Sequence, residues 1–343
     1  MTKQKRATLV DIARQLGVSK AAVSFALNNR PGVSPELRER VMRVAAELRY
    51  RPNSAALALG SSRVEVIGLV INRPARTLGT EAFFPELMAG IQAGLSETHT
   101  GLQTLVVSSL GEELSAYEAW RGAHRVDGVV VVDPRRDDER VALLSELGLP
   151  AVQIGSHPSS AADIPSVWID DHAVATDLFS MLFEQGHRRI AHVMGRLDFE
   201  HTELRRQALH ACSHRFPGAV PQSVETDYSA EQAARATADL IEGSARPTAI
   251  VYDNDVMALA GLRAAQERGV RVPEQISIAS FDDSIAMTLV RPSITALTRD
   301  TFALGELAAR TLMRRIDADE PVPSVPAVPP LLSVRESTAP PAR

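Results

Sequence analysis

Carboxylate, amide and guanidinium side chains follow several short apolar runs in this sequence. These side chains are Asn72, Arg73, Asp253, Asn254, Asp255, Asp282 and Asp283. Each hydroxyl of a polyhydroxylated ligand both donates and accepts hydrogen bonds, so a site for such a ligand needs acceptors and donors together. Tyr228, which stands just before a helix-like run, can add an aromatic face. For each acidic pair, the alternative interpretation is a turn or a helix cap.

Alternating strand-like and helix-like runs must position these side chains. The strand-like runs cover residues 64–72, 102–110, 127–132, 150–155, 188–195, 248–254 and 276–283. The helix-like runs cover residues 85–98, 139–147, 172–185, 203–213, 229–242 and 257–268. This alternation predicts parallel, doubly wound sheets with helices on both faces, and the number of units predicts two lobes. Ligands of such folds bind beyond the carboxyl ends of the strands, where the polar side chains stand.

Motifs of nucleotide-dependent and hydrolytic enzymes are missing from the sequence. It contains neither a G-x-G-x-x-G after a strand nor a phosphate-binding G-x-x-x-x-G-K-[ST] loop, and no G-x-S-x-G nucleophile turn. One group of potential metal ligands stands out: His201, His210, Cys212 and His214. Because such residues on an amphipathic helix more often serve packing or the surface, we predict no metal site, no cofactor and no enzymatic activity.

Charge is distributed unevenly along the 343 residues. Residues 1–63 hold 12 Lys and Arg against 4 Asp and Glu, a net charge of +8, whereas residues 64–343 carry −13. A basic head on an acidic body predicts a polyanionic partner for the head, the alternative being a solvated basic tail. The single cysteine and the lack of a signal peptide or of an apolar run long enough for a membrane span predict a cytoplasmic, nucleoid-associated protein.

The basic head reads as three helical segments. Thr8 can cap the first segment and Gly17 ends it, Ser19 can cap the second, and Ser34 followed by Pro35 starts the third. The apolar residues expected to face inward are Val10, Ile12, Ala13, Leu16, Val23, Ala26, Leu27, Leu37, Val41, Val44, Ala45 and Leu48. Two short helices joined through a glycine turn and followed by a third predict a helix-turn-helix, with an unspecialised three-helix bundle as the alternative.

The outward face of the second helix is the candidate for reading DNA. It carries Lys20, Ala21, Ser24, Phe25 and Asn28. Its N-terminal end is the part that helix-turn-helix proteins place in the major groove. An outward Phe25 can touch a thymine methyl group; alternatively, its ring folds back over its own domain.

Residues 50–63 form a separate short segment, YRPNSAALALGSSR. Pro52 stops the preceding helix, Asn53 can cap a new one, and Gly60 can close it. A helix of less than two turns is not stable alone. The segment is therefore either an ordinary interdomain linker or a hinge helix that folds on DNA and inserts a leucine from the minor groove.

Taken together, the motifs resemble the LacI/GalR family of transcriptional regulators over nearly the whole chain. The resemblance is carried by TLVDIARQLGVSKAAVSFALNNRPGVS, LRYRPNSAALAL, VIGLVI, AFFPEL, GHRRIAHVMG, YDNDVMALAGLRAAQERGVRVPEQISIASFDD, RPSITALTRD and SVREST. It implies a body like that of periplasmic sugar-binding proteins, with three crossovers between its lobes. It also implies a homodimer on pseudo-palindromic, double-stranded operator DNA and a small effector of the sugar class between the lobes.

The resemblance implies roles for individual residues. Lys20, Ala21, Ser24 and Phe25 take base-reading positions; Thr8, Ser19, Asn28 and Ser34 take phosphate-binding positions; and Asn53, Leu57 and Leu59 belong to the hinge, with Leu59 as the minor-groove lever. The implied effector contacts are Phe84, Arg205, Tyr228, Asn254, Asp282 and Arg299. Two departures from the family pattern bear on DNA reading, because Phe25 and Leu57 stand where arginine is common.

The resulting prediction is an effector-controlled transcriptional regulator, a repressor, with no membrane partner. Its expected parts are a helix-turn-helix domain (1–50), a hinge (51–63), an effector and dimerisation domain (64–338) and a tail (339–343). The N-lobe is expected at 64–170 and 300–328, and the C-lobe at 171–299 and 329–338. The Pro-rich segment 321–330 is expected to be a surface linker and the last residues a frayed end. The alternative function is that of a cytoplasmic solute-binding protein without gene control.

Overall fold

The computed structural model describes residues 7–27, 31–48, 50, 63–155, 164–318 and 320–342. The chain divides into two compact units, one ending at Val64 and one beginning at Glu65. Four of the predicted DNA contacts lie outside the described residues, namely Asn28, Asn53, Leu57 and Leu59. Within the described part of the chain, none of the helices combines the length and the apolar character needed to cross a membrane.

Three helices make up the first unit, as predicted. They are α1 (Leu9–Leu16), α2 (Lys20–Leu27) and α3 (Pro35–Glu47). The expected caps form: the Ser19 hydroxyl accepts the N–H of Ala22 at 3.1 Å, and that of Ser34 accepts the N–H of Leu37 at 3.3 Å. Gly17 ends α1 with a φ of 70°, in the left-handed region that glycine adopts without strain.

The core of this unit is small and formed by one face of each helix. Ile12, Val23 and Val41 are fully buried at its centre. Val10 does not join them, because it is 47% exposed. It lies two residues from Ile12, about 200° around the helix, so the two side chains leave α1 on opposite sides. The inward position predicted for Val10 was therefore wrong.

A parallel six-stranded sheet forms the first lobe of the second unit, called the N-lobe. Its strands are β1 (Val66–Asn72), β2 (Gly101–Val107), β3 (Gly128–Val131), β4 (Ala151–Gly155), β5 (Ser166–Trp168) and β11 (Val325–Pro326), in the order β11-β5-β4-β3-β1-β2. One face packs against α6 (Phe83–Gly94) and α14 (Thr301–Asp317), the other against α7 (Leu110–Gly122) and α8 (Glu139–Glu146). The short helix α5 (Ala75–Leu78) follows β1.

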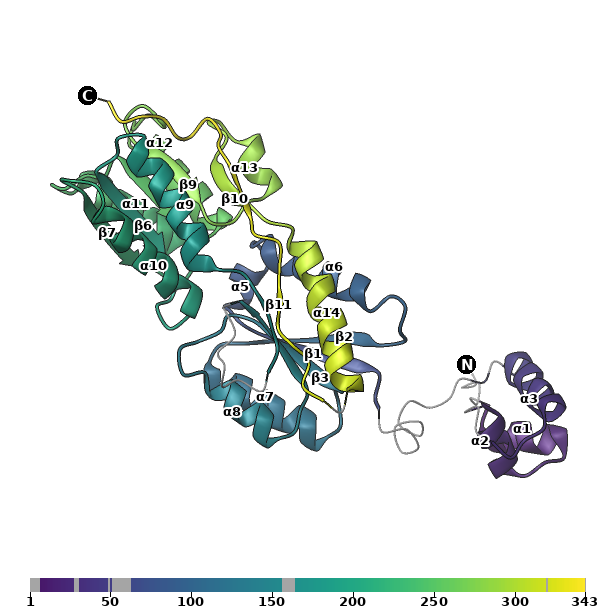
Figure 1. Ribbon diagram of the computed structural model, residues 1–343. Coiled ribbons are helices and arrows are strands. Elements are labelled where there is room, and N and C mark those ends of the chain that lie inside the picture. Colours follow the sequence, from purple (N-terminus) through teal and green to yellow (C-terminus); the bar gives the residue numbers. More distant parts are fainter. Residues whose placement is uncertain are drawn as a thin grey trace. The chain divides into compact units, whose positions relative to one another are not determined.

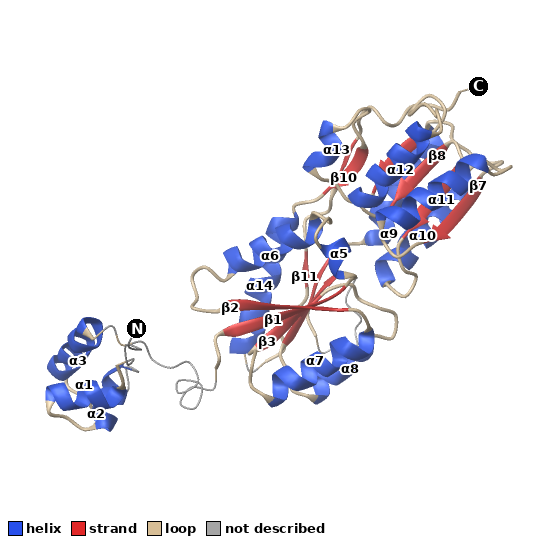
Figure 2. Cartoon of the chain, turned by 180° about the vertical axis from the view of Figure 1, so that it is seen from behind, coloured by secondary structure: helices blue, strands red, loops and turns tan. Residues whose placement is uncertain are grey.

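A second six-stranded sheet forms the C-lobe. Its strands are β6 (Arg189–Met194), β7 (Val220–Glu225), β8 (Ala249–Tyr252), β9 (Ser277–Ser280), β10 (Thr295–Thr298) and β12 (Leu331–Ser333), in the order β12-β10-β9-β8-β6-β7. All pairs are parallel except β10–β12. Helices α9 (Asp171–Glu184) and α10 (Glu200–Ser213) cover one face, and α11 (Ala230–Glu242) and α12 (Asp255–Glu267) cover the other (Figures 1 and 2). Helix α13 (Ile285–Leu289) precedes β10.

The chain passes from one sheet to the other three times, after β5, β10 and β11. Consecutive side chains of the central strands alternate between two apolar cores. In β8, for example, Ile250 packs under α11 and α12, whereas Val251 packs under α9 and α10. Both sheets are thus doubly wound, and the predicted fold class is confirmed.

The C-terminal part of the chain is more structured than the sequence suggested. The Pro-rich segment contains β11, which pairs with β5 at the edge of the N-lobe sheet, so it is not merely a surface linker. Nor does the chain fray directly after residue 338. The N–H of Ala339 donates to the Ser277 hydroxyl at 3.1 Å, and its carbonyl oxygen lies 3.0 Å from His187 Nε2.

Candidate DNA-binding surface and effector pocket

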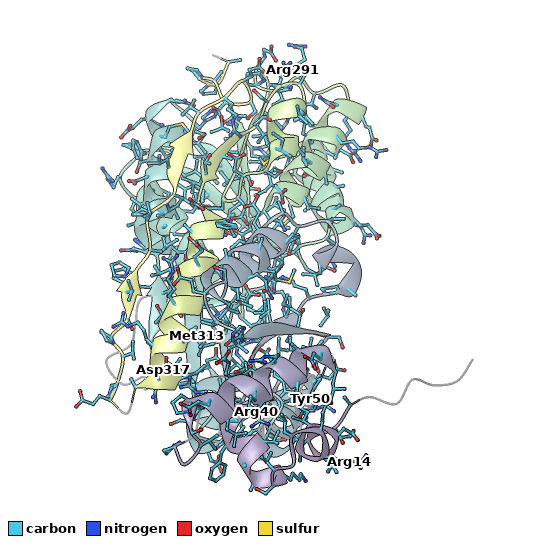
Figure 3. The ribbon with its side chains drawn as sticks, turned by 90° about the vertical axis from the view of Figure 1, so that its right-hand side faces the viewer. Arg14, Arg40, Tyr50, Arg291, Met313 and Asp317 are labelled. Carbon is cyan, nitrogen blue, oxygen red and sulfur yellow. The ribbon has the colours of Figure 1, made fainter. Side chains whose placement is uncertain are left out.

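The outward face of α2 carries the described residues predicted to read bases. Lys20, Ala21 and Phe25 are exposed, and Ser24 is half-buried. Arg14 and Arg40 add positive charge elsewhere on the surface of this unit (Figure 3). The unit therefore offers exposed basic groups and, on α2, a short helix face that is free of acidic residues.

Phe25 is the apolar exception on this face. It lies outside the apolar core of its unit and is 39% exposed. Its ring borders the turn before α3, since a Cβ atom placed on Gly32 would lie 3.8 Å from Phe25 Cδ2. The ring therefore rests against its own domain at one edge and is open to solvent elsewhere.

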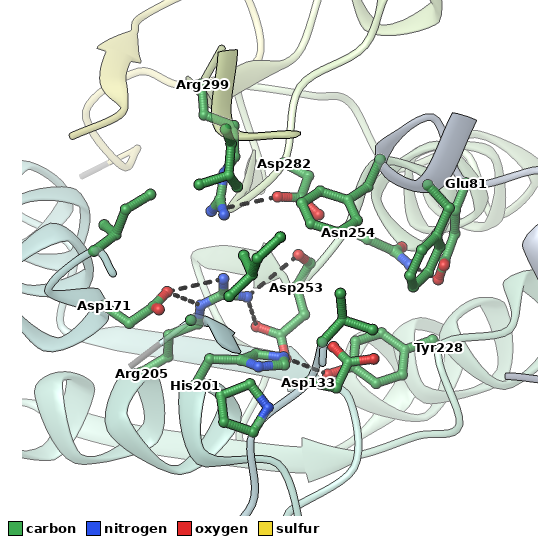
Figure 4. Close-up of a pocket in the computed structure, with 18 of the residues that line it drawn as sticks. Glu81, Asp133, Asp171, His201, Arg205, Tyr228, Asp253, Asn254, Asp282 and Arg299 are labelled. Atoms are coloured by element: carbon green, nitrogen blue, oxygen red, sulfur yellow. Dashed lines mark hydrogen bonds and ion pairs between the residues drawn. The ribbon is translucent and has the colours of Figure 1, made fainter. Parts of the chain in front are cut away.

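A pocket lies where the carboxyl ends of the two sheets meet. All six predicted effector contacts line it: Phe84, Arg205, Tyr228, Asn254, Asp282 and Arg299. Each follows a strand or begins or lines a helix, so the strand order brings together residues that are far apart in the chain. One wall is apolar and comes from Ile154, Val167, Ile169 and Leu304. The facing wall is polar and comes mainly from the C-lobe (Figure 4).

Arg205 is the centre of the polar wall. Its Nη2 lies 3.1 Å from Asp171 Oδ1, and its Nη1 lies 3.1 Å from Asp253 Oδ1. Asp253 also accepts the N–H of Gly195 at 2.7 Å and faces His192 Nε2 at 2.9 Å. Burial alone would raise the pKa of Asp253, but His192 and Arg205 hold it well below its ordinary value. The network fixes the Arg205 guanidinium at the base of the pocket.

Arg73, directly after β1, joins the two lobes inside the pocket. Its Nη1 pairs with Asp133 Oδ2 of the N-lobe at 2.8 Å. Its guanidinium carbon also lies 4.5 Å from the ring centre of Tyr228 and 4.7 Å from that of Phe199, both in the C-lobe. Because a cation over an aromatic face in a desolvated site is attracted to it, Arg73 holds the lobes together.

Tyr228 is held in an unusual conformation. Its φ is 68°, a region that a bulky residue rarely adopts. Its hydroxyl lies 2.9 Å from His201 Nε2 and 3.0 Å from the hydroxyl of Thr202. A Cβ atom at Gly195 would overlap the ring. Glycine at position 195 is therefore needed for Tyr228 to form this wall.

Glu81 is a buried carboxylate at the edge of the pocket. Its Oε1 accepts a hydrogen bond from Asn254 Nδ2 at 2.8 Å, which links the loop before α6 to the N-terminus of α12. Burial raises the pKa of Glu81 to about 7. Burial and the nearby Arg205 lower the pKa of His201, so its imidazole is neutral near pH 7.

Sequence reasoning placed some pocket residues and missed others. The rule that ligands bind beyond strand ends pointed to Arg73, Asp253, Asn254, Asp255 and Asp282. The same rule, applied to the predicted strand-like run 127–132, would have identified Asp133 as a pocket residue. Sequence reasoning did not identify Glu81, Asp171 or the role of His201, nor the contact of Phe199 with Arg73. Across the described residues, no group of three or more His, Cys, Asp or Glu side chains is arranged to hold a metal ion.

Comparisons with known proteins match the two units separately. The model described as "Bacterial regulatory proteins, lacI family" matches residues 8–53, and that of a periplasmic binding protein-like domain matches residues 179–338. Catabolite control protein A of Priestia megaterium is 30% identical over 96% of this chain and 99% of its own length. The chain belongs to the LacI family of bacterial regulatory proteins.

Other LacI-family relatives resemble the chain over nearly its full length. The transcriptional regulator CelR of Thermobifida fusca is 30% identical over 98% of this chain and 100% of its own. The Lac repressor dimer bound to operator and an anti-inducer matches with a TM-score of 0.83 at 26% identity, covering 98% of this chain and 100% of that one. A CelR–cellobiose complex matches with a TM-score of 0.71 at 29% identity over 97% of this chain and 100% of that one.

These matches establish the broad function. The protein is a DNA-binding transcriptional regulator, as the sequence predicted. The match over residues 8–53 decides against a solute-binding protein without gene control. The named relatives are regulators rather than enzymes.

Proposed function

We propose that this LacI-family protein is a cytoplasmic repressor that binds a pseudo-palindromic operator as a homodimer and is controlled by a small hydroxyl-rich effector. The observation that carries the proposal is the pocket, where six residues predicted from sequence line one cavity shared by two lobes. The pocket pairs an apolar wall with convergent donors and acceptors, which suits a sugar ring with its hydroxyl groups. The cellobiose bound to the related CelR supports this ligand class.

On the DNA side, α2 lies in the major groove and reads bases through Lys20, Ala21, Ser24 and Phe25. The Ser19 and Ser34 oxygens accept backbone N–H groups, which leaves each hydroxyl hydrogen able to donate to a phosphate. The hydroxyl of Thr8 instead donates to Asp11 Oδ2 at 2.7 Å, so a phosphate contact by Thr8 must replace that bond.

The effector acts by binding two states of the protein with different affinity. Because residues of both lobes line the pocket, a ligand there changes the free energy of lobe closure. The hinge passes this change to the DNA-binding unit, since residues 51–63 connect the two units. In this proposal Asn53, Leu57 and Leu59 form the hinge contacts, with Leu59 inserted from the minor groove.

DNA binding is tested by fluorescence anisotropy of the intact chain with operator-like and unrelated duplexes over a range of salt concentrations. Leu59→Ala should weaken binding to the operator more than binding to unrelated DNA. Equal losses on both duplexes would identify a passive linker. Failure of the intact chain to bind any operator-like duplex at low salt would refute the proposal.

Base reading by Phe25 is tested with Phe25→Ala on a set of operators that each carry one changed base pair. Loss confined to one thymine position supports contact with its methyl group. A uniform loss over all operators assigns the ring to packing against its own domain.

Effector control is tested with Asp282→Asn. Asp282 is 23% exposed and pairs with Arg299 at 3.5 Å, so it is open to a ligand. We expect the variant to bind operator normally and to lose its response to the effector. Asp177→Asn, at an exposed position on α9, is the matched control. A full response by Asp282→Asn would place the effector elsewhere.

A further inference from the structure

Charges in the effector pocket are unevenly matched. Its described lining contains three guanidinium groups and six carboxylates, namely Glu81, Asp133, Asp171, Asp253, Asp255 and Asp282. Each guanidinium group already has a carboxylate partner. Arg73 pairs with Asp133 at 2.8 Å, and Arg299 pairs with Asp282 at 3.5 Å. Arg205 pairs with Asp171 and Asp253, each at 3.1 Å. No arginine of this lining is therefore left without a countercharge for an anionic ligand.

Helix N-termini, the other common anion site, are also occupied by acidic residues. Helices α9 and α12 both begin at the pocket, where their backbone N–H groups and dipoles would favour a phosphate. Asp171 stands in the first turn of α9 and Asp255 in the first turn of α12. The side chains of Asp170 and Asn254 cap these helices by accepting backbone N–H groups. The chain's own oxygen atoms thus take the place that a phosphate would need.

Two carboxylates of the lining are weakly paired or unpaired. Glu81 lies 3.9 Å from Arg73 Nε, a much longer separation than that between Arg73 and Asp133. Among the described residues Asp255 forms no ion pair; its Oδ1 accepts the N–H of Val256 at 2.9 Å. Burial raises the pKa of both groups. A hydrogen-bond donor from a ligand would offset the cost of burying these two carboxylates.

We propose that the effector carries no phosphate or carboxylate and presents hydrogen-bond donors, hydroxyl or ammonium, to Glu81 and Asp255. This inference rests on the proposed function, in which the pocket holds the effector. The surroundings of Arg73 show that this cavity can hold a cation, because the Arg73 guanidinium lies between the Tyr228 ring and the carboxylate of Asp133. An anionic group at this place would instead face several carboxylates, and each guanidinium group near it already has a carboxylate partner.

A thermal-shift panel with the full chain separates the ligand classes. The probes are glucose, galactose and mannose, each as the neutral sugar, the 2-amino sugar and the 6-phosphate. A ligand that binds only the native state raises its melting temperature. We expect stabilisation by at least one neutral or amino sugar and none by its phosphate. Preference for the amino form identifies ammonium as the donor, and equal effects of both forms identify hydroxyl. Stabilisation by a phosphate form at least equal to that by its neutral parent would overturn the inference.

Glu81→Gln tests the inference without a ligand. The charged groups around Glu81 are Arg73, Asp133 and Asp282. Because the pKa of Glu81 rises from its ordinary value of 4.5 to about 7 on folding, the parent chain loses stability as the pH rises from about 4.5 to 7, and the full loss is present at pH 8. Glu81→Gln should therefore melt above the parent chain at pH 8, and the difference should nearly disappear as the pH falls to about 4.5. The control Glu231→Gln, at an exposed position on α11, should change neither value.

The two experiments fail in different ways. A Glu81→Gln variant without stabilisation at pH 8 would overturn the charge inference, because the carboxylate would then be adequately neutralised. A silent sugar panel together with a stabilised Glu81→Gln variant would argue against a hexose as the effector of the proposed function and uphold the charge assignment. With a sugar that binds, Glu81→Gln should weaken an amino form about tenfold or more, since hydrogen bonds to charged groups contribute about 1.5–3 kcal/mol.

Discussion

Gly195→Ala should displace the aromatic wall of the pocket, although it replaces none of the predicted effector contacts. The added Cβ would overlap three carbon atoms of the Tyr228 ring, so the ring must move. Its hydroxyl would then lose the contacts with His201 and Thr202, which now measure 2.9 and 3.0 Å. Two hydrogen bonds of about 1 kcal/mol each, with about 1–3 kcal/mol for overpacking, give an expected loss of about 3–5 kcal/mol in the free energy of unfolding.

Urea unfolding at pH 7 measures this loss, and titration with a stabilising ligand measures the pocket. Gly101→Ala is the matched control, because a Cβ there meets no atom within 4 Å. We expect the control to stay within about 0.5 kcal/mol of the parent chain, as is usual for surface substitutions. If Gly195→Ala were as stable as the control and bound ligand normally, Tyr228 would not be fixed as described.

Three further predictions concern other parts of the fold. Burial lowers the pKa of His187 to about 4, so the stability contributed by its neutral imidazole is complete above pH 6.5 and is lost as the pH falls toward 4. Between pH 7 and 5 the free energy of unfolding of the parent chain, measured with urea, should fall by about 2 kcal/mol more than that of His187→Gln. Equal losses would contradict this prediction. Arg140→Met should cost about 3–5 kcal/mol by the same assay, since it leaves Glu113, now paired with Arg140 at 2.8 Å, as a buried unpaired charge; a variant as stable as the parent chain would contradict this. Ser34→Ala should lower the free energy of unfolding of the DNA-binding unit by about 1 kcal/mol, because it removes the N-cap of α3, and Ser34→Thr is the conservative control. Circular dichroism measures the helix content during unfolding, and equal unfolding curves for Ser34→Ala and the parent chain would contradict the prediction.

The sequence predicted the elements whose patterns are strong. The central strands are continuous apolar runs because both of their faces are buried, as at β8, and the helices between them show one apolar face. Weak patterns were missed. Strand β7 is an edge strand that is mostly half-exposed, and β11 contains Pro326, which an edge position tolerates but a central strand does not. The long helix α14 was not predicted, although Asp300 caps it by accepting the N–H of Ala303.

The candidate site was predictable where it follows from topology. Asp253 and Asp282 end neighbouring strands, so parallel pairing alone brings them together. Glu81 lies beside them only because the two lobes meet, and single-sequence patterns do not encode a contact between separately folded sheets. Asp171 lies beside them because α9 packs against α10 in the same lobe, where Arg205 pairs with both Asp171 and Asp253. The conformation of Tyr228 is likewise set by its surroundings, since nothing local to tyrosine favours a φ of 68°.

Backbone strain at the junction of the lobes has a consequence for regulation. Five non-glycine residues of the described chain have positive φ, and two of them, Asp133 and Tyr228, contact the Arg73 guanidinium from opposite lobes. Such conformations cost about 1–3 kcal/mol each and persist only where surrounding contacts hold them. Those contacts include the ion pair of Arg73 with Asp133 in the N-lobe and its contacts with the Tyr228 and Phe199 rings in the C-lobe. The contacts with the two rings exist only while the lobes meet. Separation of the lobes would remove the contacts of Arg73 with Tyr228 and Phe199, but it would leave the Tyr228 hydroxyl bonded to His201 and Thr202 and leave Arg73 paired with Asp133. The two states therefore differ by less free energy than the full set of contacts suggests. Because the free-energy difference between the closed and open states is small, a ligand of ordinary affinity can shift the population between them.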